Sequence, residues 1–246
     1  MSLENIRVIG FDADDTLWEN EILFRKAEKE YCKVLAEYKS KGNILSSLLL
    51  TELKNMELYG YGIKAFVLSL IENALLISDK KITASQTSLI INIGKNMLEN
   101  KVILLDGVKE TLNTLSVRFK LILVTKGDLL DQERKLKKSG LLKFFSHVEI
   151  ITEKHEKNYQ RLLKDTETTA DHFLMVGNSV KSDILPVLNL GGYAAYIPFK
   201  SIWALEYSDS SKIENDRFFQ LGNMREILTL FTDPGKMDHK LKNIPK

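Results

Sequence analysis

The sequence is poor in the residues that mark several classes of protein. It contains one cysteine, Cys32, so no intramolecular disulfide is available and a disulfide-stabilised secreted fold is not expected. Its four histidines are scattered and show no spacing typical of a zinc site. No apolar run approaches the roughly 18 residues of a membrane-spanning helix, and no signal-peptide pattern opens the chain. We therefore expect a cytoplasmic protein without a membrane partner.

An excess of one charge sign is also lacking. The chain has 35 Lys and Arg against 33 Asp and Glu, and a net charge of +2 gives no electrostatic reason to expect a nucleic-acid partner. Hydrophobic residues make up 44%, enough for a globular protein with a full core. The length of 246 residues fits one α/β domain with an insertion, or two modest domains.

What the chain does contain is a series of short apolar runs without polar alternation. Such runs suit strands that are buried on both faces, as in a parallel sheet. Four of the five end in small or polar residues, as expected where ligands bind beyond the carboxyl ends of strands in an open α/β sheet. The runs are 6–11, 121–124, 148–151, 173–176 and 193–197.

Helical patterns separate the later runs. Residues 129–139 form a charged amphipathic stretch closed by Gly140, and further helices are expected over 159–164 and 182–190. Strands and helices alternating at this rhythm predict βαβ units and a Rossmann-like parallel sheet.

The long segment between the first two runs has helical patterns only. An apolar stripe at three- and four-residue steps covers 24–38, and residues 66–77 are apolar enough for a helix in the core of a bundle. Thr83 and Gln86 form a candidate capping box, which opens a helix whose apolar stripe includes Leu89, Ile90, Ile93 and Met97.

These patterns predict a protein of α/β class that consists of two domains. Residues 18–105 are expected to form an all-helical cap domain, inserted after the first strand and placed to act as a lid. Residues 1–17 and 106–246 are expected to form the Rossmann-like catalytic core. Within that core, Trp203 is either part of a flap near the site or an aromatic packed against the edge of the core.

The sharpest chemical feature is the sequence Asp12-Ala13-Asp14-Asp15-Thr16, which ends the first run. Clustered carboxylates repel one another and acids are poor strand formers, so the cluster suggests a positive group among them, most simply a divalent cation. Hard oxygen ligands suit magnesium, which also coordinates phosphate oxygens. The alternative is an acidic turn or a helix N-cap, both of which favour aspartate.

Three later strand ends carry complementary groups. Thr125 and Lys126 begin a strand-to-helix turn that could cradle an anion, although a lone threonine there is also a plain N-cap. Lys154 offers an ammonium that could neutralise a phosphate, although so charged a stretch is also typical of solvated surface. Asn178 and Asp183 supply an amide and a carboxylate just after another buried run.

This order of groups resembles the haloacid dehalogenase superfamily of hydrolases over nearly the whole chain. The family's first motif, Asp-x-Asp-x-Thr after a hydrophobic strand, is matched by Asp12, Asp14 and Thr16. Its second, a Ser or Thr closing the next core strand, is matched by Thr125. The resemblance implies a phosphatase-type member with an inserted helical cap.

The third and fourth motifs are matched less directly. Lys154 is the better match to the third-motif lysine, because Tyr159 follows it at about the usual aromatic spacing, and Lys157 is the rival. Asp183 matches the closing aspartate of the fourth motif. Asn178 stands where many members carry a further aspartate, which removes one negative charge beside the expected ion.

The resemblance also implies the role of each residue. Asp12 would be the nucleophile, and Asp14 the general acid and base. Magnesium would be held by Asp12, Asp14 through its carbonyl, and Asp183, with Asn178 orienting Asp183 or a water on the metal. The expected phosphate-binding residues are Thr125, Lys126 and Lys154.

We therefore predict a magnesium-dependent phosphatase that acts on a small phosphorylated metabolite, as a monomer or homodimer. A phosphomutase and a dehalogenase on the same scaffold stay open as alternatives, as does a protein that binds a phosphorylated ligand without turnover. Dehalogenation has no alkoxide leaving group and so needs no general acid. The presence of Asp14 therefore argues against it. The intact set of Asp12, Asp14 and Asp183 argues against lost catalysis.

Overall fold

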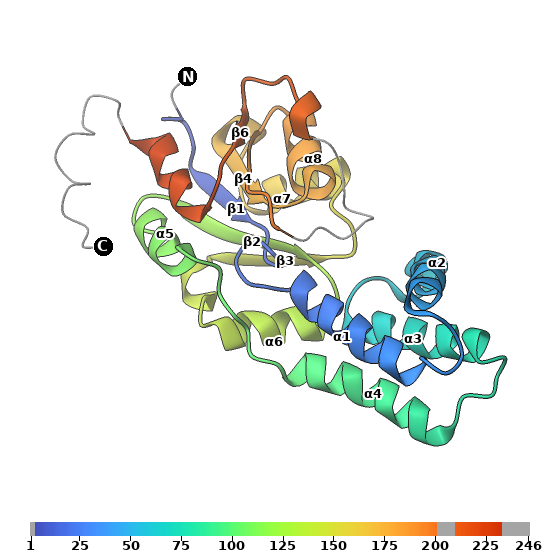
Figure 1. Ribbon diagram of the computed structural model, residues 1–246. Helices are drawn as coiled ribbons and strands as arrows, with labels where there is room; N and C mark the ends of the chain where they lie inside the picture. Colours follow the sequence, from blue (N-terminus) through green and yellow to red (C-terminus); the bar gives the residue numbers. More distant parts are fainter. Residues whose placement is uncertain (1–2, 201–209, 233–246) are drawn as a thin grey trace.

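The apolar runs form one parallel sheet in the computed structural model, which describes residues 3–200 and 210–232. Its strand order is β3-β2-β1-β4-β5-β6 (Figure 1). The strands are β1 (Val8–Phe11), β2 (Lys120–Lys126), β3 (His147–Ile151), β4 (Phe173–Gly177), β5 (Tyr193–Tyr196) and β6 (Phe218–Gln220). The predicted Rossmann-like sheet is confirmed, whereas Trp203 lies outside the described residues.

Helices cover both faces of this sheet, which explains why its strands lack polar alternation. Ile9 and Phe11 of β1 pack on one face, against α5 (Val108–Leu115), α6 (Leu129–Ser139) and the 3₁₀ helix η5 (Met224–Phe231). Val8, one residue away, packs on the other face with α7 (Glu156–Asp165) and α8 (Leu185–Asn189). Every strand position in the centre of the sheet is therefore apolar.

The core differs from the prediction in three places. Strand β2 continues through Thr125 to Lys126, because β3 pairs with it as far as Ile151. The short strand β6 has only three residues, too few to stand out as an apolar run. The helix expected over 182–190 is divided into a π-helical turn, η3 (Val180–Ile184), and α8, whose first turn contains Pro186.

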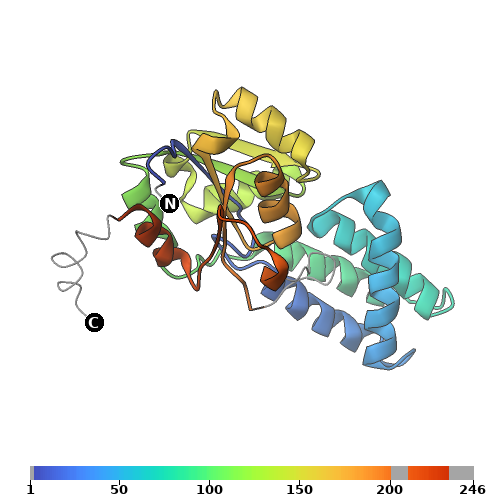
Figure 2. The ribbon, with the colours of Figure 1, turned by 90° about the horizontal axis from the view of Figure 1, so that it is seen from above.

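The cap is a group of four helices beside the sheet (Figures 1 and 2). They are α1 (Glu21–Val34), α2 (Lys41–Tyr59), α3 (Ile63–Ile77) and α4 (Ala84–Glu99). They enclose a hydrophobic core of their own, centred on buried residues such as Tyr31, Leu48, Leu70 and Ile90. The predicted all-helical cap inserted after the first strand is thereby confirmed. No described helix is long and apolar enough to cross a membrane.

Helix α4 buries most of its predicted stripe. The capping box is present, Ile90 and Met97 are buried and Ile93 is partly buried, whereas Leu89 is 50% exposed. The reason lies at Gly94, where a Cβ atom would come within 2.2 Å of the Val67 side chain on α3. This close approach of the two helices fixes which face of α4 is buried.

Two adjacent chain segments connect the cap to the core. The Glu19 amide donates to the Ile103 carbonyl at 2.9 Å, and the Leu105 amide donates to the Leu17 carbonyl at 3.0 Å. The chain therefore leaves the core and returns to it through a paired, antiparallel connection. Because this connection starts directly after the acidic motif, the cap is attached at the edge of the sheet where the predicted site lies.

Candidate functional site

The site lies where the strand order reverses. Strand β1 lies between β2 and β4. From β1 the sheet extends through β2 to β3 on one side, and through β4 and β5 to β6 on the other. In open α/β sheets, ligands bind beyond the carboxyl ends of the strands at such a switch point. Asp12 directly follows β1, and Asn178 directly follows β4, which places both at this position.

Lys154 joins two of the predicted carboxylates. Its Nζ lies 2.5 Å from Asp12 Oδ1 and 2.6 Å from Asp183 Oδ1, and the residue is only 3% exposed. Burial by itself would lower the pKa of the Lys154 ammonium, but Asp12 and Asp183 outweigh burial and hold it above its ordinary value. Lys157, the rival candidate, is exposed. Lys154 is therefore the lysine that faces the acidic motif, as a permanent cation.

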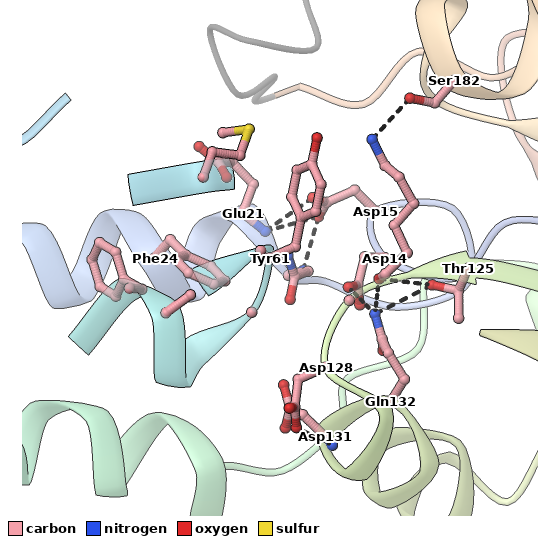
Figure 3. Close-up of a pocket in the computed structure, with 18 of the residues that line it drawn as sticks. Asp14, Asp15, Glu21, Phe24, Tyr61, Thr125, Asp128, Asp131, Gln132 and Ser182 are labelled. Atoms are coloured by element: carbon pink, nitrogen blue, oxygen red, sulfur yellow. Dashed lines mark hydrogen bonds between the residues drawn. The ribbon is translucent and has the colours of Figure 1, made fainter. Parts of the chain in front are cut away.

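The predicted phosphate cradle lies on the next strand. Thr125 is 1% exposed, and its Oγ1 accepts a hydrogen bond of 3.2 Å from Gln132 Nε2 (Figure 3). Lys126 extends towards the fourth motif, where its Nζ donates to Ser182 Oγ at 2.9 Å (Figure 3), and it also lies 4.6 Å from the centre of the Tyr61 ring. Lys126 thus connects the core to a residue of the cap.

The Asn178 side chain meets two oxygen atoms of the acidic motif. The terminal side-chain atom of Asn178 lies 3.2 Å from Asp12 Oδ2 and 3.3 Å from the Asp14 carbonyl oxygen. When this atom is the amide nitrogen, it donates to both; when the amide is rotated by 180°, three oxygens face one point. Neutral and anionic oxygens in this arrangement are the donor set that magnesium prefers.

The Asp183 carboxylate is turned towards other partners. Its Oδ1 contacts Lys154, and its Oδ2 accepts from the Ser179 amide at 3.0 Å. Consistent with this, no cluster of three or more His, Cys, Asp or Glu side chains in residues 3–200 and 210–232 is arranged to hold a metal. A metal site here depends on a backbone carbonyl and the Asn178 amide as well as on carboxylates.

The Asp14 carboxylate has partners that the sequence analysis missed. Lys135 Nζ lies 2.7 Å from its Oδ1 and 2.8 Å from its Oδ2, Gln132 Nε2 donates to Oδ2 at 2.8 Å, and Trp18 Nε1 donates to Oδ1 at 2.6 Å. Gln132 and Lys135 lie on one face of α6, three residues apart. That spacing was visible in the sequence, but nothing in it indicated which face would meet Asp14.

Asp15 has a structural position in the same motif. Its Oδ1 accepts from the Asn20 amide at 2.8 Å and its Oδ2 from the Glu21 amide at 3.0 Å, so it satisfies backbone donors at the start of α1. Burial raises its pKa to about 7. The alternative interpretation of the acidic motif, a helix cap, therefore holds for Asp15, while Asp12 and Asp14 face the cavity.

A cavity of about 190 Å³ extends from these residues into the cap (Figure 3). On the core side it is lined by Lys126, Lys135 and Lys154, together with the acidic motif. On the cap side its charged lining consists of three glutamates from α1 and α2, namely Glu21, Glu28 and Glu52. Phe24, Tyr59, Tyr61 and Phe66 provide aromatic surface between them. The lysines of the cavity thus all lie on the core side, where they stand among aspartates, while the charged residues on the cap side are all acidic.

The glutamates of the cap differ in how they are paired. Arg25 lies 2.8 Å from Glu21 Oε1 and 3.0 Å from Glu28 Oε2. The Glu52 side chain forms no ion pair or hydrogen bond with any residue that the structure describes. Burial, reinforced by Glu28 and Glu21, raises the pKa of Glu52 to about 7.

We expect Glu52 to make the folded protein less stable as the pH rises from about 4.5 to about 7. The folded state keeps a proton on Glu52 in this window that the unfolded state has lost, so the free energy of unfolding falls with increasing pH. In Glu52→Gln this contribution disappears, which reduces the slope by at most about 1.4 kcal/mol per pH unit. Urea unfolding at pH 5, 6, 7 and 8 measures it. Glu57→Gln, exposed on the same helix, is the matched control, and equal slopes in both variants would refute the expectation.

The parallel sheet with its inserted cap and the order of the site residues indicate a haloacid dehalogenase-like hydrolase. Comparisons with known proteins agree with this class. Residues 6–191 match the family of haloacid dehalogenase-like hydrolases. A haloacid dehalogenase-like family hydrolase from Xanthomonas campestris is 32% identical, covers 92% of both chains and superposes with a TM-score of 0.82. The chain therefore belongs to the haloacid dehalogenase-like hydrolase family, and the resemblance noted in the sequence is confirmed.

More distant solved structures share the fold. A predicted phosphoglycolate phosphatase from Haemophilus somnus 129pt is 17% identical, with a TM-score of 0.60 and coverage of 93% of this chain and 99% of its own. The L-2-haloacid dehalogenase from Xanthobacter autotrophicus is 14% identical, with a TM-score of 0.60 and coverage of 92% and 98%. No curated protein matches the sequence significantly. One scaffold thus carries two reaction types, and the site residues must distinguish them.

Proposed function

We propose that this hydrolase is a magnesium-dependent phosphatase that acts on a small phosphorylated metabolite through an aspartyl-phosphate on Asp12. The observation that carries the proposal is the pairing of a buried nucleophile candidate with a second carboxylate two residues later. Asp12 is 7% exposed and fixed by Lys154, while Asp14 lines the same cavity, where it could meet a leaving group. Displacement at phosphorus with an alkoxide leaving group needs both a nucleophile and a general acid.

The residues present fit a magnesium ion. Asp12, the carbonyl oxygen of Asp14 and the side-chain oxygen of Asn178 would hold it, with Asp183 adjacent through Lys154. When bound, the ion would offset the repulsion between an anionic nucleophile and an anionic phosphate. The neutral amide of Asn178 makes this set less negative than one with a further aspartate, so we expect weaker metal binding than an aspartate at position 178 would give.

The protein's own residues supply the remaining chemistry. A carboxylate oxygen of Asp12 attacks phosphorus, and the bond from phosphorus to the leaving oxygen breaks as that oxygen takes a proton from Asp14. A water molecule then gives a proton to Asp14 and attacks the phosphorus of the aspartyl-phosphate, which releases phosphate and restores Asp12. Thr125, Lys126 and Lys154 would hold the phosphoryl oxygens during both steps.

Release of inorganic phosphate from a panel of phosphate monoesters, with and without magnesium, tests this function. We expect metal-dependent turnover of monoesters and no halide release from 2-chloropropionate. Halide release without phosphatase activity would establish the dehalogenase alternative. Binding of phosphorylated compounds without turnover would establish the non-catalytic one, and return of the phosphoryl group to a second position of the substrate would establish the mutase.

Within that panel we expect selectivity for the charge of the leaving group. Among the described residues that line the cavity, the three lysines all belong to the core, and the cap supplies Glu21, Glu28 and Glu52. Aminoethyl, hydroxyethyl and carboxymethyl phosphate have similar size and differ in charge at the distal end. At pH 8, above the pKa of about 7 to which burial raises Glu21 and Glu52, we expect kcat/KM to fall in that order, by about tenfold or more between the first and the last, which corresponds to about 1.4 kcal/mol. A preference for carboxymethyl phosphate would contradict this assignment of the cap.

A further inference from the structure

Asp14 is held by more hydrogen-bond donors than any other carboxylate of the acidic motif. An ionised carboxylate has about four lone-pair positions. Here Lys135 fills one on each oxygen, Trp18 fills the second on Oδ1 and Gln132 the second on Oδ2. All four positions are therefore occupied by donors from the protein, at distances of 2.6 to 2.8 Å.

The donors differ in rigidity. Trp18 is 1% exposed and Gln132 3% exposed, so the indole N–H and the amide NH₂ are both held in fixed directions. The Lys135 ammonium sits at the end of a flexible four-carbon chain, and it also donates to Asn20 Oδ1 at 3.1 Å. Lys135 can exchange Asp14 for another acceptor, whereas Trp18 and Gln132 keep the carboxylate plane in place.

The two ends of the Gln132 amide differ in their hydrogen bonding. Its Nε2 reaches Asp14, Thr125 and the Lys126 carbonyl, while its Oε1 is buried and accepts no hydrogen bond from the part of the chain that the structure describes (Figure 3). A buried acceptor without a donor destabilises a fold, and such groups call for an explanation in function. The orientation of the Gln132 amide is therefore set by the acceptors that its NH₂ group contacts.

We propose that Gln132 and Lys135 are positioning residues, which act through Asp14 and fix the direction in which its carboxylate faces the leaving group. Gln132 sets the plane together with Trp18, and Lys135 is the donor that gives way when Asp14 takes up the proton that it passes to the leaving oxygen. The proposal rests on the proposed phosphatase function, because only a reaction with a leaving oxygen requires this orientation.

The kinetic test compares leaving groups in Gln132→Met and Lys135→Met. The ratio kcat/KM covers the steps up to departure of the leaving group. We expect kcat/KM for hydroxyethyl phosphate to fall about tenfold or more, because its alkoxide needs a proton, and kcat/KM for p-nitrophenyl phosphate to change far less. Lys135→Arg keeps two donors and should recover most of the loss. Lys137→Met, on the exposed part of α6, should behave like the wild type. Equal losses for both substrates would overturn the proposal.

Thermal unfolding separates positioning from a role in folding. Gln132→Met removes the unpaired Oε1, which favours the folded state, and also removes the donor to Thr125 and the Lys126 carbonyl, which disfavours it. We therefore expect a small change in Tm beside a large fall in turnover of the alkyl substrate. A lower Tm that accompanies equal losses for both substrates would show that Gln132 is only structural.

Crystal structures of the wild type and both variants test the proposal independently of activity. We expect the Asp14 carboxylate to leave its present orientation in Gln132→Met or Lys135→Met. An unchanged orientation in both variants would overturn the proposal, even if the protein proves to be a phosphatase. If the orientation changes but the wild type releases no phosphate from any monoester, the positioning stands and the proposed function fails.

Discussion

Asp12→Asn is expected to lower phosphate release by at least about 10⁴-fold, because a carboxamide does not attack phosphorus at a useful rate. The substitution keeps the size and shape of the side chain. It leaves Lys154 paired with Asp183 at 2.6 Å, so the ammonium does not become an isolated buried charge. Steady-state release of phosphate from p-nitrophenyl phosphate with magnesium measures the effect, and wild-type and variant enzymes should be compared at equal folded fraction.

A second carboxylate far from the site provides the control for Asp12→Asn. Asp106 is exposed and pairs with Arg225 on the surface, so Asp106→Asn should keep the rate of the wild type within a few-fold. Trapping of a phosphoryl group on the wild type but not on Asp12→Asn would identify the nucleophile directly. A variant that keeps a near-wild-type rate would show that Asp12 is not the nucleophile.

Replacement of Lys154 is expected to affect both folding and turnover. Lys154→Met removes the cation between two buried carboxylates, and breaking a buried pair in this way typically costs about 3–5 kcal/mol. Burial already raises the pKa of Asp183 to about 7 against the lowering effect of Lys154. Without the lysine, protonation of a carboxyl group relieves the repulsion at low pH, so the deficit in the free energy of unfolding should be larger at pH 8 than at pH 5.

The loss of activity in Lys154→Met follows from the same geometry. The ammonium orients Asp12 and would neutralise phosphoryl oxygens, and removal of such a preorganised donor typically costs about 10²–10³ in kcat. Lys157→Met is the matched control, since Lys157 is exposed three residues later and should leave both stability and rate nearly unchanged. Urea unfolding and steady-state kinetics on the two variants decide between the lysines. A larger effect at Lys157 would show that Lys154 is not the site lysine.

Sequence patterns predicted the architecture well where one physical cause dominates. Burial on both faces of a parallel sheet leaves unalternated apolar runs, and each run that was predicted as a strand is one. The short strand β6 was missed because three residues at the edge of a sheet carry too little apolar signal. In the predicted stripe of α4, Ile90 and Met97 are buried and only Leu89 is exposed, at the margin of the face that Gly94 brings against α3.

The order of chemical groups along the chain determined by itself which strand ends carry the site and which family the protein resembles. The carboxyl ends of parallel strands necessarily meet at one edge, so Asp12, Thr125 and Asn178 could be brought together without coordinates. Sequence spacing already favoured Lys154 over Lys157, but only the tertiary structure turned Asp183 towards that lysine and surrounded Asp14 with Trp18, Gln132 and Lys135. The physical reason is that these contacts depend on how helices and loops rotate and pack against the sheet. That packing is set by side chains distant in sequence, and no local periodicity encodes it.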